Sequence, residues 1–131
     1  TNAGFSSAPA SDLYIAMDPD KDRPTAKKEM AAPDSLYHEV KKLIRIRQSH
    51  KALQSRGKIT FVYAEKNAYP LAYIREDGDE KILVIINAAA EAKTFACDAE
   101  PKEAIYNFGA AAEAKNGKIT VPAQSAGFYR I

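Results

Sequence analysis

The chain has 131 residues, of which 46% are apolar, so it can form one domain with a real core, or one small domain and part of another. Its 19 basic and 17 acidic side chains leave a formal charge of only +2, which argues against a general affinity for nucleic acid or for an anionic membrane. No stretch approaches the ~18 consecutive apolar residues of a membrane span.

The first part of the chain is predicted to be irregular. Residues 1–34 hold four of the seven prolines and show neither helical nor strand periodicity. A structureless stretch of this length is unusual inside a compact domain, so we expect the chain to be a fragment. The opening residues TNAGFSSAPASD lack the features of a signal peptide, which is uninformative in a fragment. The single cysteine slightly favours the cytoplasm, and the compartment stays unknown.

Residues 35–57, SLYHEVKKLIRIRQSHKALQSRG, are predicted to form one amphipathic helix and its exit, with Asp34 or Ser35 as N-cap and Gly57 as the stop. Apolar positions recur at helical spacing and form one stripe: Leu36, Val40, Leu43, Ile44 and the aliphatic stem of Arg47. Burying each such side chain is worth roughly 1.5–3 kcal/mol. We therefore expect the stripe to pack against the following domain or against another copy of the chain.

Residues 58–131 show short β-rich runs separated by turn residues. Seven strands are predicted, at 58–64, 70–76, 81–87, 93–97, 103–108, 118–122 and 127–131. The run KILVIIN at 81–87 is apolar on both faces and is predicted to be a central strand. Asp77-Gly78 and Asn116-Gly117 are tight-turn signals, and residues 109–117 are interpreted as a loop. This spacing favours an antiparallel β-sandwich.

The sequence offers no complete catalytic or metal-binding motif. Asp18, Asp20, Asp22 and Glu29 match the spacing of a calcium loop, but Arg23 occupies the glycine position, so no metal site is predicted. No pair of carboxylates has the placement that acid–base catalysis needs. Cys97 is interpreted as a small buried hydrophobe, and His38 and His50 as helix-surface or helix-end residues. No phosphate loop or dinucleotide pattern points to a cofactor.

Two groups of side chains could bind a partner. The basic residues of the helix could contact nucleic acid, but a solvated face fits the near-neutral chain better: Lys41, Lys42, Arg45, Arg47, Lys51 and Arg56. The aromatics of the β region could stack on sugar rings, although cross-strand or core packing is the favoured interpretation: Tyr63, Tyr69, Tyr73, Tyr106, Phe108, Phe128 and Tyr129.

The order of several motifs along the chain says more about its family than the chemistry of any one of them. They are NAGFS at 2–6, DRPT at 22–25, PDSLYHEVKKLIRIRQSHKAL at 33–53 and ITVPAQSAGFYRI at 119–131. In this order they resemble the C-terminal region of the α-amylase family of glycoside hydrolases (family 13), closest to its α-glucosidase and oligo-1,6-glucosidase branch.

The resemblance implies that residues 1–56 are the last loop and last helix of a (β/α)8 barrel and that 57–131 are the C-terminal all-β sandwich domain. The family's catalytic carboxylates lie on earlier barrel strands, so no catalytic residue is expected in this chain. Asn2 and Phe5 would lie near the substrate entrance. The expected partners are the missing barrel of the same polypeptide, an α-linked oligosaccharide through the parent enzyme, and a second copy of the fragment. No nucleic acid, membrane, metal or cofactor is expected.

Two other functions stay open at this point. The chain could be an independent carbohydrate-binding module, which needs an exposed row of aromatic side chains. It could also be a protein-interaction β domain that uses its basic helix.

Overall fold

The computed structural model describes Asn2 and residues 6–131, and the chain divides into two compact units, Thr1–Arg45 and Ile46–Ile131. The first unit contains the 3-10 helix η2 (Ala10–Asp12), the helix α1 (Ala26–Ala31) and the larger part of the helix α2 (Leu36–Ser49). The second unit begins inside α2, continues through the 3-10 helix η3 (Lys51–Leu53) and contains all the strands.

The amphipathic helix is confirmed: α2 ends at Ser49, and η3 and a turn form the exit that leads to Gly57. α2 starts after Ser35, whose carbonyl oxygen accepts the backbone N–H groups of His38 and Glu39. The prediction of irregular chain up to residue 34 is wrong for α1. Thr25 caps that helix by accepting the N–H of Lys28 at 3.2 Å. α1 is only six residues long, fewer than two helical turns, so it leaves no apolar period in the sequence.

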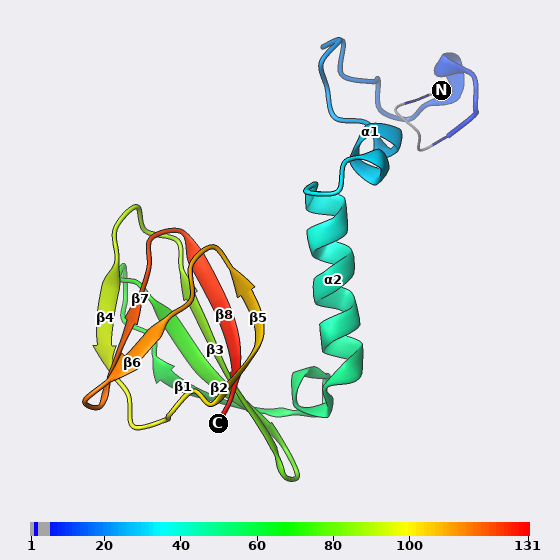
Figure 1. The fold of residues 1–131 in the computed structure, drawn as a ribbon. Coiled ribbons are helices and arrows are strands. Elements are labelled where there is room, and N and C mark those ends of the chain that lie inside the picture. Colours follow the sequence, from blue (N-terminus) through cyan, green and yellow to red (C-terminus); the bar gives the residue numbers. More distant parts are fainter. Residues whose placement is uncertain (1, 3–5) are drawn as a thin grey trace. The chain divides into compact units, whose positions relative to one another are not determined.

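The second unit is an antiparallel sandwich of two sheets, as predicted, and Figure 1 shows the sheets facing each other. The larger sheet has the order β1-β2-β3-β8-β5 and the smaller one β4-β7-β6. The strands are β1 (Lys58–Tyr63), β2 (Leu71–Asp77), β3 (Glu80–Asn87), β4 (Lys93–Ala96), β5 (Glu103–Phe108), β6 (Glu113–Lys115), β7 (Lys118–Val121) and β8 (Ser125–Arg130). The predicted central strand is β3, which pairs with β2 and β8.

The five-stranded sheet is apolar on both faces, which explains the continuous apolar run of β3. Its inner face packs against the small sheet in the main core, which includes Leu83, Ile85, Phe95, Ile119 and Val121. Its outer face carries a second cluster, in which Ile82 and Val84 of β3 pack with Ala52 of η3. Alternate residues of one strand therefore belong to two different cores.

The loop interpretation of residues 109–117 is wrong at its end. Glu113–Lys115 form the edge strand β6, which pairs with Lys118–Thr120 of β7. Asn116 and Gly117 both have positive φ, at 52° and 70°, as a two-residue hairpin turn of this kind requires. The alanine-rich sequence hides the strand, because pairing with β7 and not local propensity decides its conformation.

Candidate functional site

Of the two residues predicted at a substrate entrance, Asn2 is among the described residues. The Asn2 side-chain amide donates a hydrogen bond to the Ala8 carbonyl oxygen at 2.7 Å. Phe5 lies outside the described residues. The role assigned to both residues stays a prediction.

The acidic stretch after residue 17 forms local turns. The Asp18 carboxylate accepts the backbone N–H of Asp20 at 2.9 Å, and the Asp20 carboxylate accepts that of Asp22 at 2.9 Å. Glu29 belongs to the helix α1. Within Asn2 and residues 6–131, no three His, Cys, Asp or Glu side chains gather as a metal site would require.

Cys97 is buried, as expected, with 7% of its surface exposed. Burial raises the pKa of its thiol, so the reactive thiolate is disfavoured at neutral pH. His38 of α2 contacts the carbonyl oxygen of Met30 in α1 through Nε2 at 3.1 Å.

The apolar stripe of α2 lines a groove of about 540 Å³ within the first unit. The exposed fractions of Leu36, Val40 and Ile44 are 74%, 45% and 51%. The remaining lining residues are Pro24, Glu29, Tyr37 and Lys41. Such a contiguous apolar face is typical of a surface that another part of a protein covers. What covers it here stays a prediction.

A row of large side chains crosses the outer face of the five-stranded sheet. The register aligns one residue from each strand in the order Phe61, Tyr73, Val84, Phe128 and Tyr106. Ring centroids are 6.0 Å apart in the first aromatic pair and 5.2 Å apart in the last. Most of these aromatics are therefore cross-strand pairs, as the favoured interpretation predicted.

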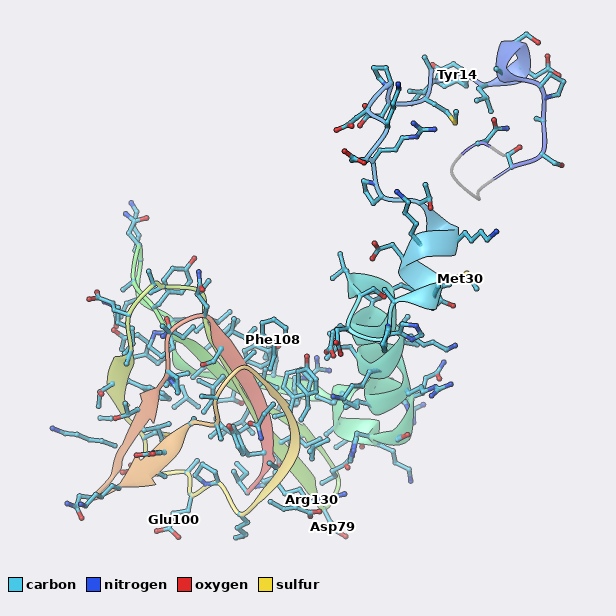
Figure 2. The ribbon with its side chains drawn as sticks, turned by 45° about the horizontal axis from the view of Figure 1, so that its top comes forward. Tyr14, Met30, Asp79, Glu100, Phe108 and Arg130 are labelled. Carbon is cyan, nitrogen blue, oxygen red and sulfur yellow. The ribbon has the colours of Figure 1, made fainter. Side chains whose placement is uncertain are left out.

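Two of the exposed aromatic side chains of the second unit lie at the margins of this face. Phe61 on the edge strand β1 is 59% exposed, and Phe108, labelled in Figure 2, lies at the end of β5 and is 52% exposed. Phe108 borders a second hollow of about 420 Å³, together with Ile86, Asn87 and Gln124. Phe61 and Phe108 thus lie on the two opposite edge strands of the sheet, with the half-buried and buried members of the row between them.

Sequence reasoning missed the carboxylate of Glu80, which lies at the start of β3 beside the turn from β2. It accepts a hydrogen bond from His50 Nδ1 at 2.6 Å and another from the Ala52 backbone N–H at 2.9 Å. Burial by itself would raise the pKa of Glu80, but these two hydrogen bonds and the charges of His50 and Arg130 outweigh it and lower that pKa. The partners lie 28 and 30 residues away in the sequence, so no local pattern could reveal them.

Arg75 binds the residues that follow η3 in the chain. Its Nη2 donates to the carbonyl oxygens of Gln54 at 2.6 Å and of Gly57 at 3.1 Å. A side chain at position 57 would place Cβ only 2.2 Å from the Ala52 carbonyl oxygen, so only glycine fits there. Glu80 and Arg75 together attach residues 50–57 to the sheet.

None of the helices in the described part of the chain has the length and apolarity needed to cross a membrane.

Comparison with known proteins points to carbohydrate-active enzymes. No protein-family model matches the chain. It is 27% identical over 121 residues to a glucan 1,6-alpha-glucosidase of Streptococcus pneumoniae serotype 4, covering 92% of the chain and 22% of that protein. It is 44% identical over 55 residues to a cyclomaltodextrinase of a Bacillus species, covering 42% of the chain and 10% of that protein.

Solved structures agree with these sequence matches. A crystal structure of the trehalulose synthase MutB superimposes with a TM-score of 0.78 at 27% identity, covering 100% of the chain and 24% of that enzyme. The monoclinic form of this enzyme, from Pseudomonas mesoacidophila MX-45, gives a TM-score of 0.73 at 26% identity over 89% of the chain and 21% of the enzyme. The chain therefore spans about a quarter or less of the length of these relatives.

Proposed function

Since the chain is a region of the α-amylase family of glycoside hydrolases (family 13), we propose that it is the C-terminal part of an α-glucan-active hydrolase or transglycosidase. In this proposal residues 1–56 complete a (β/α)8 barrel and 57–131 form the C-terminal domain. The part described here is non-catalytic and structural. Asn2 and Phe5 belong to the rim of the substrate entrance, and the substrate is an α-linked oligosaccharide bound by the whole enzyme.

One observation carries the structural role: the apolar face of α2 is exposed in a chain that spans only 22–24% of its full-length relatives. Burying Leu36, Val40 and Ile44 would contribute roughly 1.5–3 kcal/mol each. The missing barrel of the same polypeptide is the occupant that supplies enough apolar surface. Covering this face would couple the stability of the barrel to that of the sandwich.

The test uses the longer polypeptide with its upstream barrel. Ile44→Glu places a charge on the stripe, whereas Gln48→Glu places the same charge on an exposed position of the same helix. We expect Ile44→Glu to lower the melting temperature by about 10 °C and to reduce hydrolysis of maltooligosaccharide, because a charge would be buried without a partner. Equal behaviour of the two variants would contradict the proposal. The 131-residue chain alone should hydrolyse no α-glucan.

A carbohydrate-binding module is the alternative that exposed Phe61 and Phe108 support. It predicts that maltooligosaccharide binds the 131-residue chain and that Phe108→Ala weakens this binding. Calorimetry at millimolar sugar distinguishes the two functions. Heat of binding to the 131-residue chain that is lost in Phe108→Ala supports the binding module. Absence of any heat of binding supports the structural role.

A further inference from the structure

The carboxylate of Glu80 joins two parts of the second unit that are distant in sequence. Glu80 is the first residue of β3, just after the turn at Asp77-Gly78. One carboxylate oxygen accepts from His50 Nδ1 at 2.6 Å, and the other accepts from the Ala52 backbone N–H at 2.9 Å. A single side chain therefore fixes both the residue that follows α2 and the middle of η3.

These hydrogen bonds lie in a sheltered environment. Ala52 has no exposed surface and packs on Ile82 and Val84, and only 13% and 20% of the His50 and Glu80 side chains are exposed. Hydrogen bonds to a charged acceptor are stronger where little water competes. Without Glu80 the buried Ala52 N–H would have no acceptor, which is costly.

The charged groups around Glu80 come from several elements. His50 approaches from the segment after α2, and Arg130 Nη1 of β8 lies 3.8 Å from the carboxylate. Arg130 is shared, because its Nε also pairs with Glu103 of β5 at 3.1 Å. Figure 2 shows Arg130 and the turn residue Asp79 at the same end of the sandwich. The nearest strong partners of Glu80 are thus His50 and the Ala52 amide.

We propose that Glu80 is an acid-sensitive clamp that fixes the segment after α2 on the outer face of the five-stranded sheet. An ionised carboxylate has only acceptor sites, so it satisfies both N–H donors at once. A protonated carboxyl group keeps its carbonyl oxygen for one donor, but its O–H would face the other. Acid therefore breaks one arm of the clamp.

The direction of the pH effect follows from linkage. The pKa of Glu80 is lower in the folded chain than its ordinary value of about 4.5. The unfolded chain therefore takes up a proton first as the pH falls, which favours unfolding. The stabilisation by the clamp is complete above about pH 4.5 and is lost as the pH falls through the lowered value.

A substitution at Glu80 should change the pH at which the clamp is lost. If Glu80 only filled space, the substitution would not change this pH. In Glu80→Gln the amide oxygen can still accept from Ala52, while the amide N–H₂ must donate to an unprotonated His50 Nδ1. That arrangement requires a neutral imidazole, because a protonated imidazole has no acceptor, so acid breaks it under conditions where the wild-type carboxylate still accepts both donors. The acid limit of the clamp should therefore move to higher pH.

The experiment measures hydrogen exchange of the Ala52 amide and thermal unfolding of the 131-residue chain between pH 4 and pH 8. Glu76→Gln is the matched control, because Glu76 of β2 has only a more exposed ion pair with Lys81 at 3.2 Å. We expect Glu80→Gln to exchange the Ala52 amide at least about tenfold faster at pH 5.5 and nearly normally at pH 8, with Leu83 of the core unchanged.

A second pair of variants keeps the inference testable if Glu80→Gln folds poorly. His50→Asn places an amide donor near the position of Nδ1 and should preserve protection of Ala52, whereas His50→Ala should lower the melting temperature by about 5 °C. The clamp is refuted if Ala52 exchange is the same in Glu80→Gln and Glu76→Gln at every pH. It is also refuted if His50→Asn and His50→Ala are equally stable.

Discussion

Asn87 is expected to be one of the most sensitive polar residues of the sandwich. Its side chain is 1% exposed at the end of β3. The Nδ2 amide donates to the carbonyl oxygens of Glu91, Val121 and Pro122 at 3.0, 3.1 and 2.8 Å, and Oδ1 accepts the Ala89 N–H at 3.1 Å. One side chain thus ties the end of the large sheet to β7 of the small sheet.

The substitution Asn87→Ala removes all of these hydrogen bonds. One of them is buried and the others are partly buried, so some of the released groups can reach water. With about 1 kcal/mol for each partly buried group and up to about 3 kcal/mol for the buried one, we expect a loss of about 3–6 kcal/mol. A unit of this size has a free energy of unfolding of about 4–13 kcal/mol. The melting temperature should therefore fall by about 15–30 °C.

Asn87→Asp is the sharper test, because it keeps the shape and replaces the donors by a carboxylate that faces three carbonyl oxygens. The pKa of this buried Asp should lie above its ordinary value of about 3.9, so the variant should gain stability relative to the wild type as the pH falls from 7 to 4. Urea unfolding followed by circular dichroism measures both variants. Asn116→Asp, in the exposed β6–β7 turn, is the control. A loss below about 1 kcal/mol for Asn87→Ala would refute the reasoning.

Three further predictions concern the main core. Gly127→Ala should destabilise the sandwich by at least about 2 kcal/mol in urea unfolding, because the new Cβ would lie 2.4 Å from the Tyr129 ring. The control is Gly78→Asn, in an open turn with φ 59°, which should cost less than about 1 kcal/mol. Tyr129→Phe should cost about 1–3 kcal/mol in the same assay, because it removes the hydroxyl that donates to Asn107 Oδ1 at 2.7 Å, and a neutral result would show that water replaces it. Cys97 should react with a thiol reagent at pH 8 at least about 100-fold more slowly in the folded than in the urea-unfolded chain, because burial raises its pKa; equal rates would contradict its burial.

The strands were predictable where a turn signal and a regular apolar period coincided. β2 and β3 flank Gly78, and β3 is apolar without a break from Ile82 to Ile86 because both of its faces are buried. β6 has three exposed residues, so its sequence carries no burial pattern, and only its pairing with β7 makes it a strand. α1 escaped prediction because its six residues make fewer than two helical turns, too few for an apolar period to show.

The sequence by itself determined the sandwich, the amphipathic helix before it and the resemblance to the α-amylase family, because alternation, turn residues and motif order are local properties. The tertiary structure alone decided which polar residues hold these elements together. Glu80 and Asn87 each join segments about thirty residues apart, and in the sequence they are an ordinary turn glutamate and a strand-end asparagine. Their hydrogen bonds exist only because the sheets pack and exclude water, which no local pattern encodes.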